Sequence, residues 1–175
     1  GLFGMVPLSA SGFLLGTTVE IFGRKDFVPI ERLALLNGLL HIILAEGWEQ
    51  KEYIAARTEQ FDALRQAVAP YTPERTADIT GVGIADLRAI AEAYARSASA
   101  SIVYAMGITQ HTCGEENVHA IINLALSKGF VGREGCGLMP IRGHSGVQGG
   151  AEMGAYATAF PGGKTVNAEN AAELS

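Results

Sequence analysis

The sequence predicts an α/β fold, and three observations point to this class. The run Ser101-Ile-Val-Tyr-Ala105 holds β-branched and aromatic residues without charge, and Gly107 follows it, as is typical of a short buried strand. Helical patterns lie on both sides of this run, and a glycine-rich stretch comes after them. A strand that leads through a glycine turn into a helix is the basic unit of an open α/β sheet. We therefore expect helices packed on a sheet, with a long Gly-rich loop region at the C-terminal end.

The elements before this strand are mostly helical. A helix is predicted over 31–46, because five apolar residues follow three- and four-residue steps and Gly47 suits the position after its end. Shorter helical turns are predicted at Lys51–Arg57 and Phe61–Val68, and Pro70 and Pro73 bracket a turn. Residues 1–30 are predicted to be irregular, with short strands around 13–15 and 18–22.

Two longer helices flank the predicted strand. The first covers 85–96, where Leu87, Ala91 and Tyr94 mark an apolar face. The second covers 115–128. Glu115 in its first turn and Lys128 in its last match the polarity of the helix dipole. Thirteen of the 22 glycines lie between residues 107 and 163, so the stretch from 129 to 163 is predicted to be mostly loop.

Composition and charge exclude several classes of protein. The 175 residues include 13 Lys+Arg and 18 Asp+Glu, giving a net charge of −5 with no basic run, which argues against nucleic-acid binding. Residues 1–19 are uncharged but hold four glycines and a proline, so neither a membrane span nor a signal peptide is predicted. Cys113 and Cys136 form no CxxC pair or other metal-binding pattern.

Familiar catalytic motifs are incomplete in this sequence. Gly163-Lys-Thr165 resembles the end of a phosphate loop, but the leading glycine would fall at Thr158. Gly143-His-Ser-Gly-Val147 resembles a nucleophile elbow, but Val147 stands where glycine is needed. No GxGxxG follows a strand. These patterns therefore predict turns, and they do not predict a phosphate or nucleophile site.

The segment from Ala105 to His111 is the first candidate site. Gly107 allows a ligand to approach the backbone, and Thr109, Gln110 and His111 carry hydrogen-bonding groups directly after an apolar strand. They also precede the start of a helix, which favours an anionic group. Two interpretations stay open: these polar groups contact a ligand, or they cap the helix that follows.

The segment from Met139 to Gly150 is the second candidate. Arg142 is its one charged side chain, and glycines and short polar residues surround it. An arginine in such a loop can hold a carboxylate or phosphate through two parallel hydrogen bonds. His144, Ser145 and Gln148 supply further polar groups. The alternative interpretation is an exposed arginine on a surface loop.

Several stretches in fixed order resemble the large subunit of molybdopterin-guanine-dinucleotide oxidoreductases, above all the formate dehydrogenase alpha branch. The resemblance covers about 33–163. The stretches are Tyr71-Thr-Pro-Glu74, Asp78-Ile-Thr-Gly-Val82, Tyr104-Ala-Met-Gly-Ile-Thr-Gln-His111, Glu116-Asn-Val118, Gly129-Phe-Val-Gly-Arg-Glu-Gly135 and Pro140-Ile-Arg-Gly-His-Ser-Gly-Val-Gln-Gly149.

The resemblance implies a domain organisation. Residues 31–163 would form a Rossmann-like three-layer domain that binds the molybdopterin cofactor, preceded by an irregular segment, 1–30, and followed by a tail, 164–175. Enzymes of this family are much longer, and their [4Fe–4S] cysteine motif and metal-ligating Cys or selenocysteine lie upstream. Cys113 and Cys136 do not match that ligand. We therefore expect no metal ligand here, a chain that is part of a larger subunit, and no catalysis by the isolated chain.

The resemblance also implies residue roles. Arg142 would hold the carboxylate of formate during its two-electron oxidation to CO2, with His144 beside it where formate dehydrogenases often have Gln. The cofactor would be molybdopterin guanine dinucleotide with Mo or W. The residues expected to contact it are Met106, Gly107, Gln110, Gly143 and Gln148.

The resemblance further implies partners and leaves two alternatives. The expected partners are the remainder of the large subunit, electron-transfer subunits and a small anionic substrate, and a cytoplasmic location is favoured over a periplasmic one. The alternative functions are a non-catalytic nucleotide-binding module and an inactive fragment without the metal ligand and iron–sulfur motif.

Overall fold

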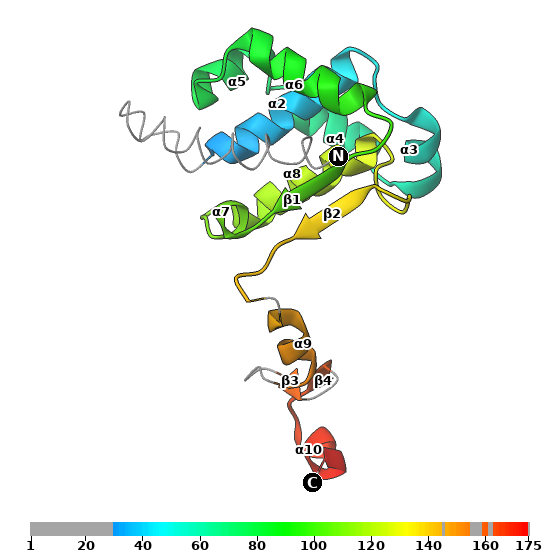
Figure 1. Ribbon diagram of the computed structural model, residues 1–175, viewed down its shortest axis with the longest axis vertical. Helices are drawn as coiled ribbons and strands as arrows, with labels where there is room; N and C mark the ends of the chain where they lie inside the picture. The colour runs from blue at the N-terminus through cyan, green and yellow to red at the C-terminus, as the bar shows by residue number, and fades with distance from the viewer. Residues whose placement is uncertain (1–29, 145, 155–158, 161–162, 175) are drawn as a thin grey trace. The chain divides into compact units, whose positions relative to one another are not determined.

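The computed structural model describes residues 30–144, 146–154, 159–160 and 163–174 (Figure 1). The strands predicted near residues 13–15 and 18–22 lie outside the described residues. The chain divides into two compact units, which meet in sequence at Pro140 and Ile141. Each unit is described by itself, whereas the sequence predicts a single domain from 31 to 163.

The first unit is mostly helical, with one parallel pair of strands. All five predicted helices are present, with ends that shift by one residue at most. The elements are, in order, α2 (Glu31–Ala45), α3 (Lys51–Arg57), α4 (Phe61–Val68), α5 (Pro73–Thr80), α6 (Ile84–Arg96), β1 (Ser101–Tyr104), α7 (Met106–Thr109), α8 (Gly114–Ser127) and β2 (Gly137–Pro140). Gly47 and Gly129, just past α2 and α8, have φ of 67° and 64°, the left-handed conformation expected where a helix ends.

Helix α5 is the longest helix that is not predicted from the sequence. Only a turn is predicted between Pro70 and Pro73, but the second proline begins a helix. Thr72 caps it, because its Oγ1 accepts a hydrogen bond from the backbone N of Arg75 at 3.3 Å. Proline is favoured at the first helical position, since the missing N–H has no partner there in any case.

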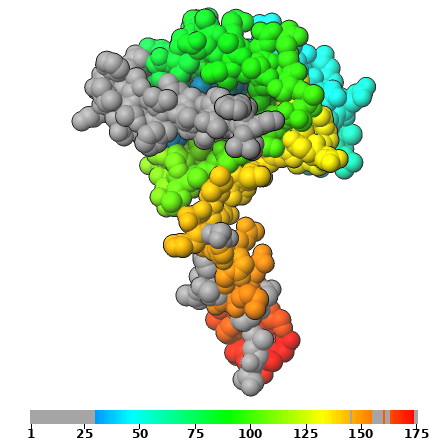
Figure 2. Space-filling model, viewed as in Figure 1, coloured from blue at the N-terminus to red at the C-terminus, as the bar shows by residue number. Residues whose placement is uncertain are grey.

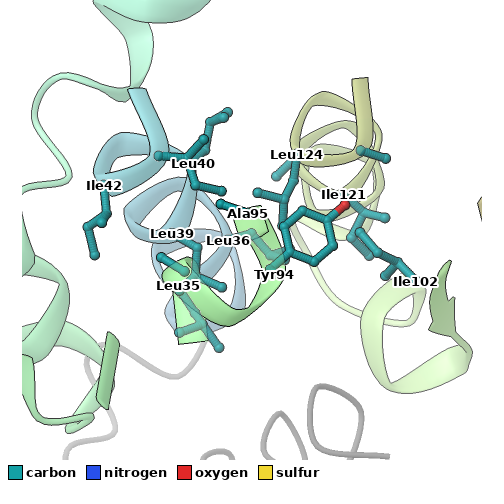
Figure 3. Close-up of a cluster of buried hydrophobic side chains, with 14 of the residues drawn as sticks. Leu35, Leu36, Leu39, Leu40, Ile42, Tyr94, Ala95, Ile102, Ile121 and Leu124 are labelled. Carbon is teal, nitrogen blue, oxygen red and sulfur yellow. The ribbon is translucent and has the colours of Figure 1, made fainter. Parts of the chain in front are cut away.

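Helix α2 is the centre of the core (Figure 3). It contacts α4, α5, α6 and α8, so apolar side chains are buried on most of its sides. Leu35, Leu39 and Ile42 are buried together with Leu36, Leu40 and Ile43. The predicted stripe of a single face is therefore too narrow, because a helix surrounded by other helices is apolar nearly all round.

The two strands pair in parallel along their whole length. The register joins Ser101 to Gly137 and Tyr104 to Pro140, and the two arrows lie side by side in Figure 1. Ile102 is buried, and its partner Leu138 packs against the same core. Strand β2 is not predicted from the sequence, because it begins with Gly137 and ends with Pro140, so the prediction of loop there is wrong. The α/β class is confirmed, while the Rossmann-like three-layer arrangement stays a prediction.

The second unit contains short elements. They are α9 (Val147–Glu152), the antiparallel pair β3 (Ala159–Phe160) and β4 (Lys164–Thr165), and α10 (Ala168–Leu174). Asn170 supports the turn between β4 and α10, because its Nδ2 donates to the carbonyl of Thr165 at 2.7 Å. The prediction of mostly loop up to residue 163 is therefore wrong at α9 and β3, and the predicted tail contains β4 and α10.

Candidate functional site

The parallel pair β1–β2 determines where a site can form in the first unit. In a parallel pair the carboxyl ends of both strands lie at one edge of the sheet, and α/β proteins bind ligands beyond that edge. Here Tyr104 ends β1 opposite Pro140, which ends β2. The chain leaves this edge twice, into Ala105 and α7 after β1, and into Ile141 and Arg142 after β2.

The segment after β1 forms one helical turn, where the sequence predicts a loop. The backbone N of Ile108 donates to Ala105 O at 2.9 Å, and that of Gln110 donates to Met106 O at 2.9 Å. The turn is exposed, with Met106 at 51%, and the yellow-green atoms of this part of the chain lie at the surface in Figure 2. Exposed backbone and side chains directly past a parallel strand are accessible to a ligand.

Three of the predicted contact residues lie together on this turn. An added Cβ at Gly107 would meet no heavy atom within 4 Å, so the space beside its backbone is open. The side chain of Gln110 is exposed and makes no hydrogen bond to any residue that the structure describes. Met106, Gly107 and Gln110 are therefore all accessible, as a ligand-contact role requires.

His111 differs from this group. Its Nε2 donates to the carbonyl of Gly107 at 2.9 Å, one turn back along the chain. This hydrogen bond closes the α7 turn on itself. His111 thus bonds within the α7 turn and does not cap α8, whose start has no hydrogen bond from a capping side chain.

The start of α8 is a weaker anion site than the sequence suggests. Glu115 and Glu116 are both exposed in its first turn. Two carboxylates there already balance the positive end of the helix dipole and repel a third negative group. An anionic ligand is therefore better served by Arg142 than by the end of this helix.

Asn117 is a residue of this region with no role predicted from the sequence. It is fully buried in the first half of α8, and its Nδ2 donates to the carbonyl of Ile108 at 3.0 Å. The available signal is its position, since Asn117 stands in line with Ile121 and Leu124 on the apolar face. A buried amide on such a face requires a polar partner.

The remaining predicted residues belong to the second unit. Arg142, Gly143 and His144 precede α9, and Gln148 lies within it; all four are exposed. Neither Arg142 nor Gln148 makes a side-chain hydrogen bond or ion pair to a residue inside the described ranges. Ser145 lies outside those ranges. The predicted residues thus form two groups, one in each unit.

Three further features bear on function. A cavity of about 650 Å³ opens between α3, α4 and α8, lined in part by Phe61 and Asn123, and it includes none of the predicted residues. Within the described parts of the chain, no three His, Cys, Asp or Glu residues are grouped to hold a metal. No described helix is long and apolar enough to cross a membrane.

Comparison with protein families decides the assignment. The model of the family described as molybdopterin oxidoreductase matches residues 29–175. The chain belongs to the molybdopterin oxidoreductase family. The match includes both groups of predicted residues and continues through α10, and this family implies a molybdopterin cofactor.

The curated relatives of this chain include formate dehydrogenases. The chain is 39% identical over 135 residues to the F420-dependent formate dehydrogenase 2 subunit alpha of Methanococcus maripaludis, covering 77% of the chain and 20% of that protein. It is 42% identical over 130 residues to formate dehydrogenase H of Escherichia coli, covering 74% and 18%.

A third relative carries a less specific name. The probable oxidoreductase YjgC of Bacillus subtilis is 32% identical over 154 residues, covering 86% of the chain and 16% of that protein. The chain therefore spans about a fifth of the length of the curated relatives that it matches.

Proposed function

We propose that this chain is the part of a formate dehydrogenase-like oxidoreductase that contacts the pterin cofactor and holds the substrate's carboxylate. One observation carries the proposal: β1 and β2 end opposite each other at Tyr104 and Pro140. The α7 turn follows β1 at this edge of the parallel pair, where α/β proteins bind ligands, and the segment with Arg142 follows β2 in the sequence.

The residues of these segments fit a large polar cofactor. Gln110 and Gln148 are exposed amides without hydrogen-bond partners among the described residues. The open space at Gly107 admits a flat group against the backbone. We assign the contacts to molybdopterin in its guanine dinucleotide form to Met106, Gly107 and Gln110 in the first unit, and to Gly143 and Gln148 in the second.

Arg142 is assigned to the substrate. Its exposed guanidinium has no acidic partner within the described residues, so its hydrogen bonds are available for an anion. A guanidinium holds a carboxylate through two parallel bonds and so fixes the direction of the remaining C–H bond of formate. His144, two residues later, is assigned a second hydrogen bond to the same anion.

The redox chemistry belongs to the cofactor. When bound, the pterin group with its Mo or W ion supplies the two-electron oxidation of formate to CO2. The chain's own residues bind and orient. We assign the metal ligand, a [4Fe–4S] cluster and the contacts to electron-transfer subunits to other parts of the longer protein.

The experiment replaces Arg142 in the full-length enzyme. Arg142→Ala removes a charge-assisted pair worth about 1.5–3 kcal/mol, so kcat/KM for formate is expected to fall roughly 10- to 150-fold while metal content stays unchanged. Arg88→Ala is the control, since Arg88 is exposed on α6 and pairs with Glu46 at 2.8 Å. Normal kcat/KM in Arg142→Ala would remove this residue from the mechanism.

A further inference from the structure

Asn117 links helix α8 to the turn that bears the predicted cofactor contacts. Its side chain is 0% exposed, and both ends of its amide have partners. Nδ2 donates to the carbonyl of Ile108 at 3.0 Å, and Oδ1 accepts from the Sγ of Cys113 at 3.9 Å. The bond to Ile108 fixes the orientation of the amide, because only its nitrogen can donate to a carbonyl, and the thiol contact to Oδ1 fits that orientation.

The backbone around this amide leaves little room for movement. A Cβ added at Gly114 would lie 2.1 Å from the carbonyl oxygen of Thr109, so the start of α8 packs directly against the end of α7. Gly114 N donates to His111 O at 3.0 Å across the same connection. The position of α7 is therefore fixed from α8 by a close backbone contact and by one buried side chain.

We propose that Asn117 is a positioning residue, whose amide holds the Met106–Thr109 turn in the arrangement that the pterin cofactor requires. This inference rests on the proposed function, because it takes Met106, Gly107 and Gln110 as the cofactor contacts. Asn117 itself is fully buried, so its side chain is not accessible from the exposed face of the turn. It acts through Ile108, whose carbonyl lies between Gly107 and Gln110 in the chain.

The test measures the α7 turn and the cofactor separately in the full-length protein. Hydrogen exchange followed by mass spectrometry reports on the amides of Ile108 and Gln110, which donate within the turn. In Asn117→Ala their exchange is expected to speed up about tenfold, the effect of losing one buried hydrogen bond. Bound pterin, assayed by fluorescence after release, is expected to fall several-fold, while exchange in α6 stays unchanged.

Two variants serve as controls. Asn123→Ala changes another asparagine of α8 that lines the α3–α4–α8 cavity, and it is expected to leave exchange at α7 and pterin content unchanged. Cys113→Ala removes the thiol that contacts Oδ1 and keeps the bond from Nδ2 to Ile108. It is expected to give a smaller increase in α7 exchange than Asn117→Ala, and if Asn117→Ala does not fold, unchanged α7 exchange in Cys113→Ala would overturn the positioning role.

The outcomes separate this inference from the proposed function. Unchanged exchange at α7 in a folded variant would overturn the positioning role, and so would faster exchange with undiminished pterin. Gln110→Ala tests the function itself. If that variant keeps its pterin, the proposed contact is wrong whatever Asn117 does; if it loses pterin and Asn117→Ala does not, only the positioning role fails.

Discussion

Replacing Gly114 with alanine tests the contact between α7 and α8 most directly. The added methyl carbon would lie 2.1 Å from the carbonyl oxygen of Thr109 and 2.9 Å from its carbonyl carbon. Both neighbours are backbone atoms, so no side-chain rotation relieves the clash. One helix must move away from the other by more than an ångström. This movement would stretch the hydrogen bond from Asn117 to Ile108, which joins the same two helices.

The expected magnitude follows from two opposing terms. Inserting a methyl group into closely packed structure costs about 1–3 kcal/mol. Alanine is favoured over glycine in a helix by up to about 1 kcal/mol, which offsets part of that cost. Gly107→Ala gains the second term without the first, because an added Cβ there meets nothing within 4 Å. We expect Gly114→Ala to be about 1–3 kcal/mol less stable than Gly107→Ala.

Urea unfolding followed by tryptophan fluorescence measures this difference. Trp48 is the single tryptophan of the sequence, and it packs partly buried against the core of the first unit, so its emission reports on that unit. Gly107→Ala is the matched control because it makes the same chemical change in the same connection. Equal free energies of unfolding for the two variants would refute the close approach of α8 to Thr109.

Two further substitutions test the core and the α3–α4 connection. The Tyr94 hydroxyl is buried without a hydrogen-bond partner among the described residues, and burial, helped by nearby Cys136, raises its pKa well above the usual value. Above about pH 10 the phenol therefore loses its proton in the unfolded chain and keeps it in the folded one. The free energy of unfolding consequently falls as the pH rises past that point. Tyr94→Phe is expected to be as stable as the parent at pH 7 and to lose less stability at high pH. Urea unfolding at pH 7 and pH 10.5 checks both points. If the variant and the parent lose the same stability between these two pH values, Tyr94 is not the source of the loss. Gln60, before α4, has a φ of 55°, in the left-handed region. Gln60→Gly is expected to raise the free energy of unfolding by about 0.5–1 kcal/mol, which is the left-handed penalty less the entropic cost of glycine. Gln60→Ala is expected to leave it unchanged, and a glycine variant less stable than the parent would contradict the strain.

The sequence predicts helix boundaries correctly where the local signals agree with the packing. Helix α8 carries acidic residues at its start and Gly129 past its end, and the structure confirms both boundaries within a residue. Helix α5 was missed because its sequence, with three threonine or proline residues in eight, has low helical propensity. Its buried Thr76 and Ile79 show that packing against α2 and α6 stabilises it instead.

The sequence indicates the candidate residues of the site but not how they are buried or bonded. The polar groups after β1 and the isolated Arg142 stand out in the sequence because short polar residues and glycines follow apolar runs. Asn117 did not stand out, since one asparagine in a helix is unremarkable until its burial and its bond to Ile108 are known. Burial of a polar group is a property of the fold, and no local pattern reports it.

The pairing of β1 with β2 is the feature of the first unit that the sequence predicts least. Four residues that begin with a glycine and end with a proline carry almost no strand signal, yet β2 pairs with β1 at every position. A parallel pair requires a crossover between its strands, and α8 provides it. Helix α8, whose ends the sequence predicts well, thus brings β2, which the sequence does not predict, beside β1. If this pairing were shifted by one residue, Leu138 would leave the core face and Met139 would enter it. The packing of Leu138 against the core therefore fixes the register of β2 against β1.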